Sequence, residues 1–393
     1  MFVAWRDLRF AKGRFALMGS VVLLITLLVG LLSGLTAGLA RENISAVTGL
    51  PATHLAFAEP PGEQKVSFTH SQVPEKAWQA WRGRPGVKSA QPLGIRTTNA
   101  AAGERTAAVS VFGVDPAGPL APPAGPLAPP AGPLAPPAGP LAPPAGPLAP
   151  PAAAGLGQGR VVLAEKAAKE LGGLTAGSRL KIGLLELAVA AVSGTAAYSH
   201  TPVVWMDLND WQRIGNPGTS PDTVATVVAL DAPDASGAAL AAGDTAAGTR
   251  AQTIDEALGA IGSYQAENGS LQLMRGFLFA ISALVIGAFF TVWTIQRAGD
   301  IAVLKALGAS TPYLLRDALG QAVVMLAIGT GAGTALAAGI GALISGGDVP
   351  FVLDAATVLA PAAIMIVLGA LGAALSIRRI TAVDPLTALG SAR

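Results

Sequence analysis

The sequence predicts a membrane protein with four transmembrane helices and one α+β domain outside the membrane. Only 13% of the 393 residues are charged, whereas about 25% is usual for a soluble domain. Four long runs contain no charged residue, and a long polar segment separates the first run from the second. One span, a large domain and then three spans is not the pattern of an ordinary cytosolic protein.

Each of the four charge-free runs is long enough to cross a bilayer, because a spanning helix needs about 20 apolar residues. The runs are Phe15–Ala40, Gly276–Gln296, Ala318–Gly347 and Ala355–Ile377. We predict that the first run is a retained helix, since the apolar part of a cleaved signal peptide has only about 7–15 residues. The third run is rich in glycine, and we expect its outer end to be irregular.

The Lys and Arg residues of the short loops predict the orientation in the cell membrane, because they accumulate on the cytoplasmic side. Basic residues stand before the first run, between the second and third runs, and after the fourth run. They are Arg6, Arg9, Lys12, Arg14, Arg297, Lys305, Arg316, Arg378, Arg379 and Arg393. The loop 348–354 carries only Asp348 and Asp354 as charged residues. We therefore predict a multi-pass protein with both termini in the cytoplasm.

These observations divide the chain into nine parts. In order, they are a cytoplasmic N-terminal segment (1–14), transmembrane helix 1 (15–40), an extracytoplasmic α+β domain (41–273), transmembrane helix 2 (274–296), a cytoplasmic loop (297–317), transmembrane helix 3 (318–347), an outer loop (348–354), transmembrane helix 4 (355–377) and a cytoplasmic tail (378–393). In the large domain, strand-like and helix-like segments mix without regular βαβ alternation, which indicates an α+β domain. We expect a strand over 66–69, a helix over 74–81 and a loop over 232–248.

A proline-rich repeat interrupts the large domain. Residues 118–152 are five copies of Gly-Pro-Leu-Ala-Pro-Pro-Ala, and three prolines in each copy exclude an α-helix. Such a segment is a semi-rigid spacer. It is either a tandem expansion tolerated in a surface loop, which we favour, or a ligand for a proline-binding partner or the cell wall.

Several kinds of chemistry are absent from the sequence. The chain has no cysteine, no phosphate-binding Gly-x-x-x-x-Gly-Lys-Ser/Thr loop, no His-Glu-x-x-His and no Gly-x-Ser-x-Gly. Its net charge of +2 gives no indication of nucleic-acid binding. His54, His70 and His200 lack metal-ligand spacing, so we predict surface or turn positions for them and no metal site. The chain is expected to be a non-catalytic subunit without a tightly bound cofactor.

The cytoplasmic loop has the pattern of a short amphipathic helix. Ile301, Leu304 and Leu307 recur at helical spacing, Gly308 is a typical residue for the end of a helix, and Pro312 prevents its continuation. A helix of this kind either lies in the membrane interface or inserts into a partner protein. The loop is too short to need an anchor, which favours the partner.

The layout and three motifs resemble the FtsX-like (MacB-type) permeases of ABC transporters. The motifs are Asp300-Ile-Ala-Val-Leu-Lys-Ala-Leu-Gly-Ala-Ser, the basic tail from Arg378, and the start Trp5-Arg-Asp-Leu-Arg-Phe. The start resembles the family's amphipathic elbow helix, which implies an elbow over residues 1–14. The resemblance implies a MacB-like periplasmic core domain and a homodimer that binds two copies of a separate cytoplasmic ATPase, where the ATP is bound. It also implies a coupling helix that includes Asp300, Ile301, Leu304, Lys305, Leu307 and Gly308.

Three segments are most similar to the haem-exporting (HrtB-like) branch of this family: Met1–Asn43, Tyr198–Trp205 and Glu267–Arg275. This similarity implies that haem, or a similar amphipathic molecule, is the transported substrate. A carboxylate can ligate ferric iron, and an arginine can pair with a propionate. The candidate substrate-binding residues are Glu267, Met274, Tyr264 and Arg275. The alternatives are transmission of movement to external cell-wall hydrolases, or export of a peptide, lipid or antibiotic.

Overall fold

The structure is a computed structural model that describes residues 12–122, 155–215, 220, 222–296, 299, 303, 307–344 and 349–381. It divides into two compact units. One, here called the helical unit, comprises Met1–Leu39 and Gly269–Arg393. The other, here called the β-rich unit, comprises Ala40–Asn268. The elbow up to residue 11, the repeat from residue 123 onward and the tail from residue 382 lie outside the described residues.

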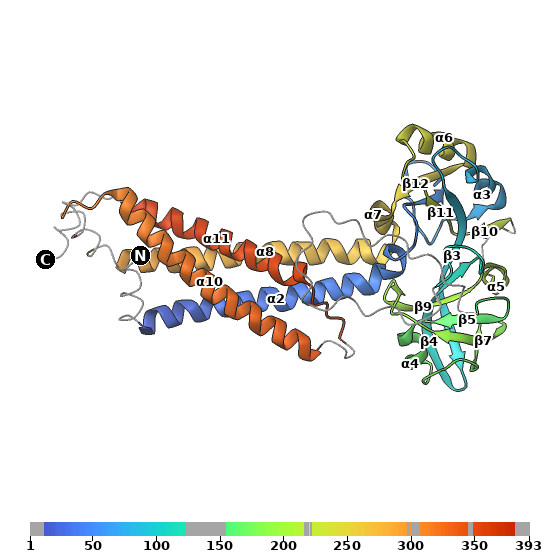
Figure 1. Ribbon diagram of the computed structural model, residues 1–393, viewed down its shortest axis with the longest axis horizontal. Helices are drawn as coiled ribbons and strands as arrows, with labels where there is room; N and C mark the ends of the chain where they lie inside the picture. Colours follow the sequence, from blue (N-terminus) through green and yellow to red (C-terminus); the bar gives the residue numbers. More distant parts are fainter. Residues whose placement is uncertain are drawn as a thin grey trace. The chain divides into compact units, whose positions relative to one another are not determined.

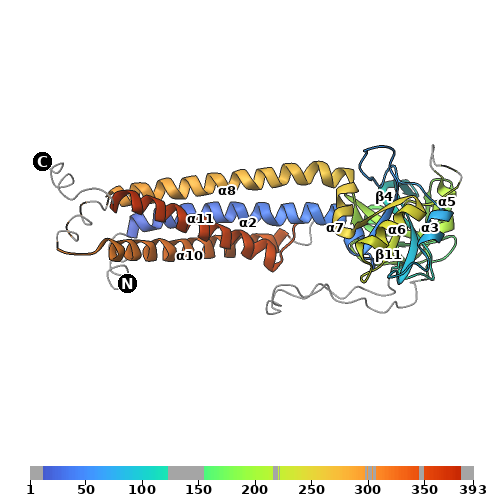
Figure 2. The same cartoon turned by 90° about the horizontal axis from the view of Figure 1, so that it is seen from above.

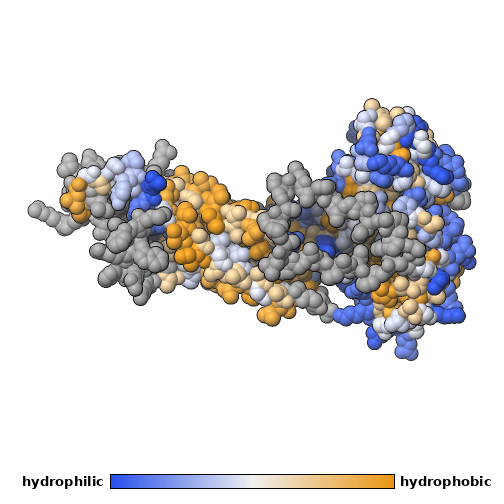
Figure 3. Space-filling model, in the orientation of Figure 1, coloured by the Kyte–Doolittle hydropathy of each residue, from blue (hydrophilic) through white to orange (hydrophobic). Residues whose placement is uncertain are grey.

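The described part of the helical unit consists mainly of four long helices (Figures 1 and 2). They are α2 (Lys12–Thr48), α8 (Gly262–Gln296), α10 (Thr311–Ile344) and α11 (Ala355–Thr381), and α2 and α8 also contribute residues to the β-rich unit. All four are long and apolar enough to cross a membrane. Many of their large apolar side chains are exposed, as lipid contact requires, and they colour much of the visible helix surface in Figure 3. The prediction of four transmembrane helices with an α+β domain is confirmed.

Helices α2 and α10 pack closely because small residues face each other. A Cβ atom on Gly333 would lie 2.5 Å from the carbonyl oxygen of Leu23. A Cβ atom on Gly30 would lie 2.8 Å from Cβ of Ala337. Small residues four positions apart let helix backbones approach in a membrane. The glycines of the third run lie inside a continuous helix as far as Ile344, so the part of the run that is described shows no irregularity. Its last residues, 345–347, lie outside the described residues.

The last helix of the unit has an identifiable start and an internal proline. The backbone N–H of Thr357 donates to Oδ1 of Asp354 at 2.7 Å, and the N–H of Asp354 donates to Oγ1 of Thr357 at 3.1 Å. This reciprocal pair satisfies donors that a helix N-terminus leaves free. Pro361 lies inside α11 and has no N–H to donate to the carbonyl group of Thr357.

The described residues of the β-rich unit form twelve strands and several short helices. The strands are β1 (His54–Ala58), β2 (Val73–Pro74), β3 (Ser89–Ala102), β4 (Arg105–Val114), β5 (Arg160–Leu163), β6 (Arg179–Ile182), β7 (Leu185–Val192), β8 (Ala197–Tyr198), β9 (Thr201–Asp207), β10 (Thr223–Ala225), β11 (Val227–Asp231) and β12 (Thr249–Thr253). The helices are α3 (Glu75–Trp81), α4 (Glu165–Glu170), α5 (Leu208–Ile214), α6 (Gly237–Ala247), α7 (Ile254–Ala257) and the 3-10 turn Leu258–Ala260.

The main sheet has two halves that share strand β3. Its order is β12-β1-β11-β3-β4-β9-β5-β7-β6, and a further pairing of β3 with β6 closes the last six strands into a barrel. Residues 89–93 of β3 pair with β11, whereas residues 94–102 pair with β4. The barrel encloses one apolar core, which includes Val109, Leu163 and Val204. The other half packs against α3 and α6 around the buried Trp81.

Two local predictions in this unit were wrong. Residues 66–69 form no strand, although Val66 and Phe68 are buried in the core as the alternating pattern requires. The low-complexity stretch 232–248 is not a loop, because it contains helix α6, which Ser236 caps by accepting from the N–H of Ala239. Alanine has the highest helix propensity, so an alanine-rich segment can form a helix although its composition is simple. The predicted helix over 74–81 is confirmed as α3.

Candidate functional site

Five polar side chains meet within the β-rich unit. They are Asn43, Ser199, His200, Ser263 and Glu267, here called the polar cluster. Asn43 is on α2, Ser199 and His200 form the turn between β8 and β9, and Ser263 and Glu267 are in the first turns of α8. Residues that are 224 positions apart in the chain are therefore in direct contact.

A tight turn positions His200. Tyr198 pairs with Thr201 across the hairpin, so only Ser199 and His200 connect the two strands. Both have positive φ values, 50° and 63°, as in a type I′ turn, which usually contains Asn and Gly. This conformation costs about 1–3 kcal/mol for each non-glycine residue. Contacts to α2 hold the turn, since the N–H groups of Ser199 and His200 donate to the carbonyl oxygens of Asn43 and Glu42 at 3.0 and 3.2 Å.

The side chains of the cluster form a continuous hydrogen-bond network around Glu267. Nε2 of His200 lies 2.9 Å from both carboxylate oxygens of Glu267. The amide nitrogen of Asn43 donates to Glu267 at 3.2 Å, and the amide oxygen of Asn43 accepts from the hydroxyl of Ser263. The hydroxyl of Ser263 in turn lies 2.8 Å from that of Ser199. These bonds fix the orientation of the carboxylate.

Exposure differs across the network. Asn43 is buried at 1% exposure, whereas the side chains of His200 and Glu267 are 30% and 43% exposed. The carboxylate is therefore hydrogen-bonded on its buried side and accessible to solvent on the other side. A carboxylate and an imidazole in contact can both ligate iron or orient a polar ligand. A ligand that binds either group must replace or share their mutual hydrogen bond.

The neighbouring residue Tyr198 belongs to the apolar core. Its ring packs edge-on against Phe68 and Phe112 at centroid distances of 5.7 and 5.8 Å. Burial raises the pKa of the Tyr198 hydroxyl, because the charged form would be desolvated. The packed ring of Tyr198 therefore anchors the residue that directly precedes the strained turn.

The other candidate substrate residues lie at different places along α8. Tyr264 packs against the apolar core of the β-rich unit. Met274 and Arg275 are in the helical unit. Met274 is 48% exposed, and the buried Nε of Arg275 has no hydrogen-bond partner among the described residues. The structure brings Glu267 together with His200 and Asn43, which the sequence analysis did not select. The available signal was that these three residues come from the three segments most similar to the haem-exporting branch.

Part of the predicted coupling segment is described. Asp300, Ile301, Leu304 and Lys305 lie outside the described residues. Leu307 is 79% exposed, and its N–H donates to the carbonyl oxygen of Val303 at 3.0 Å, as in a helix. Gly308 has a φ of +94°, the left-handed conformation that commonly follows a helix. Pro312 has a second role that was not predicted, because it lies in the first turn of α10, where its missing N–H costs nothing.

Comparison with known proteins gives matches to both units. Residues 273–385 match the family FtsX-like permease C-terminal. The chain is 32% identical over 143 residues to a hemin transport system permease protein HrtB of Staphylococcus epidermidis, covering 36% of this chain and 41% of the relative. It is 37% identical over 130 residues to the HrtB of Staphylococcus haemolyticus, covering 33% and 37%. The match therefore spans about two fifths of the length of these relatives.

Among solved structures, the chain is similar to the periplasmic region of MacB from Actinobacillus actinomycetemcomitans. The sequence identity is 12% and the TM-score is 0.34. The match covers 53% of this chain and 92% of the solved chain.

Proposed function

We propose that the chain is the membrane subunit of an ABC transporter that exports haem or a similar amphipathic molecule, since residues 273–385 match the FtsX-like permease C-terminal family. The relatives named as hemin transport permeases support this choice of cargo. In the proposal, two copies of the chain assemble with two copies of a cytoplasmic ATPase. The chain lacks a phosphate-binding loop, so ATP is hydrolysed on the partner.

The observation that carries the choice of cargo is the polar cluster. Its carboxylate is held by His200 and Asn43 and is open on one side. In the proposal, Glu267 binds the iron or orients the polar edge of the cargo. His200 keeps the carboxylate in position before the cargo arrives, and Asn43 supports both from within the buried part of the network. Met274, Tyr264 and Arg275 remain candidate contacts further along α8.

The test is haem loading of the purified chain, measured by its Soret absorption. We expect Glu267→Ala to abolish the band, because the iron loses a ligand. His200→Ala should weaken haem affinity by about tenfold, as is usual when the partner of a ligand is removed. The control is Glu104→Ala, since Glu104 is an exposed residue of the β3–β4 turn.

Three results would contradict parts of the proposal. Unchanged loading in Glu267→Ala would exclude Glu267 as a ligand. Equal losses in Glu267→Ala and Glu104→Ala would indicate a general effect rather than a site. A wild-type chain that binds no haem would favour another cargo, or transmission of movement to an external enzyme.

The proposal also specifies which loops face the cytoplasm. Because the chain contains no cysteine, single cysteines can be labelled without background. We expect Ala309→Cys to react with a membrane-impermeant maleimide only after the cells are permeabilised, and Glu104→Cys to react in intact cells. Labelling of Ala309→Cys in intact cells would reverse the orientation.

A further inference from the structure

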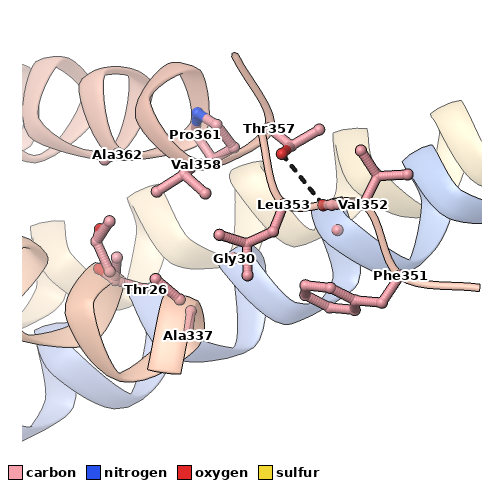
Figure 4. Close-up of a pocket in the computed structure, with 13 residues that line it drawn as sticks. Thr26, Gly30, Ala337, Phe351, Val352, Leu353, Thr357, Val358, Pro361 and Ala362 are labelled. Atoms are coloured by element: carbon pink, nitrogen blue, oxygen red, sulfur yellow. Dashed lines mark hydrogen bonds between the residues drawn. The ribbon is translucent and has the colours of Figure 1, made fainter. Parts of the chain in front are cut away.

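A narrow apolar pocket lies inside the helical unit, between α2, α10, the segment 349–354 and α11 (Figure 4). Small and apolar residues such as Gly30, Ala337 and Pro361 form its walls. Thr26, Thr334 and Thr357 supply its side-chain hydroxyl groups. The free volume between the walls is only about 10 Å3, room for about one water molecule, so a larger molecule can enter only if a wall moves.

The ring of Phe351 fills the part of this region where glycine side chains are missing. A Cβ atom on Gly34 would lie 2.3 Å from Cζ of Phe351, and one on Gly341 would lie 2.3 Å from its Cε1. The backbone beside the ring is held by two hydrogen bonds: the N–H of Val352 donates to the carbonyl oxygen of Gly34 at 3.1 Å, and Oγ1 of Thr357 donates to that of Val352 at 3.3 Å. Residues 350–353 are neither helix nor strand, so few bonds must break to move the ring.

The pocket also contains a polar group without a partner. Thr26 is 2% exposed, and its hydroxyl is buried and makes no hydrogen bond within the described part of the chain. Leaving a buried hydroxyl unsatisfied costs about 1–3 kcal/mol. On α11, Pro361 cannot bond the carbonyl group of Thr357. The hydroxyl group of Thr26 and the carbonyl group of Thr357 both belong to residues that line the pocket.

The position of Thr26 indicates what kind of molecule would satisfy it. Thr26 is near the middle of the charge-free run 15–40, so in a spanning helix it lies near the centre of the bilayer. Lipids present only hydrocarbon at that depth. A partner for the hydroxyl must therefore be a mostly apolar molecule that carries a hydrogen-bonding group along its length.

We propose that this pocket is an intramembrane binding site for the apolar part of a small amphipathic molecule with a hydroxyl or carbonyl group, and that the ring of Phe351 moves aside when the molecule binds. That the natural occupant is the exported cargo rests on the proposed function. Each chain would then hold a second contact point for cargo, separate from the polar cluster.

The site can be tested without haem, ATP or the ATPase. The probe is an octanol that carries a photoreactive diazirine, applied to the purified full chain in phospholipid nanodiscs, with adducts located by mass spectrometry. We expect adducts on pocket residues such as Ala337 and Ala338, and we expect excess unlabelled 1-octanol to remove them. Thr26→Val should weaken this labelling about tenfold, because one hydrogen bond is lost. Phe351→Ala should increase it several-fold.

The matched control is Thr291→Val on the exposed side of α8, where the hydroxyl donates to the carbonyl oxygen of Gly287. It should leave pocket labelling unchanged. Labelling of Ala337 that octanol does not compete, or that equals labelling of the exposed Leu343, would overturn the proposal. So would equal effects of Thr26→Val and Thr291→Val. If Phe351→Ala does not fold, Thr26→Val and the wild-type chain decide the question. Failure here would leave the haem-loading test of the proposed function untouched.

Discussion

Leu304→Asp is expected to abolish ATP-driven export while the chain still folds and inserts. By their spacing, Ile301, Leu304 and Leu307 would share one face of the proposed coupling helix. Burying each such side chain in a partner contributes roughly 1.5–3 kcal/mol at most. A charge at the central position adds the cost of desolvating a carboxylate. In the proposed transporter, the ATPase would therefore lose its docking site.

The measurement is export by cells that express both subunits, together with co-purification of the ATPase. Ala306→Asp is the control, because at 100° per residue Ala306 lies opposite the apolar face. It adds the same charge to the same loop and should retain most export. Normal export and normal assembly of Leu304→Asp would show that this face does not bind the ATPase.

Gly333→Leu is expected to destabilise the helical unit by about 3 kcal/mol, the upper end for overpacked sites. Its new side chain would start 2.5 Å from the carbonyl oxygen of Leu23 and 2.8 Å from Cβ of Thr26. Backbone atoms and Cβ atoms cannot be moved by a change of rotamer, whereas the end of a long side chain can. The two helices must separate, and the contacts along α2 and α10 are lost with them.

Thermal unfolding of the purified chain in detergent measures this effect. Gly331→Leu, two residues earlier on the same helix, is the control, since a Cβ atom there meets nothing within 4 Å. Leucine also has a higher helix propensity than glycine, so the control should be as stable as the wild type or slightly more stable. Equal unfolding temperatures for the two variants would contradict the close packing of α2 and α10.

The spanning helices could be predicted from the sequence because their signal is local. A run of 20 or more residues without a charged side chain is sufficient evidence of a span. This evidence does not depend on what the helix packs against. Helix α3 was equally accessible, since Trp78 and Trp81 mark a face at helical spacing. Helix α6 was missed because a run of alanine and glycine carries little amphipathic pattern, and its burial depends on Trp81, whose ring lies against Gly243.

The polar cluster could not be predicted, because it depends on contacts between residues far apart in the chain. Glu267 was selected for its position just before a span, but nothing in its own segment indicates that His200 lies 2.9 Å away. His200 was assigned to a surface or turn, and it does lie in a turn. Its contact with Glu267 requires two consecutive residues with positive φ, which Ser and His do not predict. The hydrogen bonds from the turn to α2 stabilise this conformation, which the local sequence does not favour.

Strand β3 has a mechanical consequence for the β-rich unit. Since one unbroken strand is paired in both halves, a swing of one half against the other would have to bend β3. Bending the unit would require breaking several main-chain hydrogen bonds at once, each contributing about 1 kcal/mol. If one half rotates, the other half should therefore rotate with it by the same angle. In the proposed transporter, this stiffness would pass a movement of one half of the β-rich unit on to the other half.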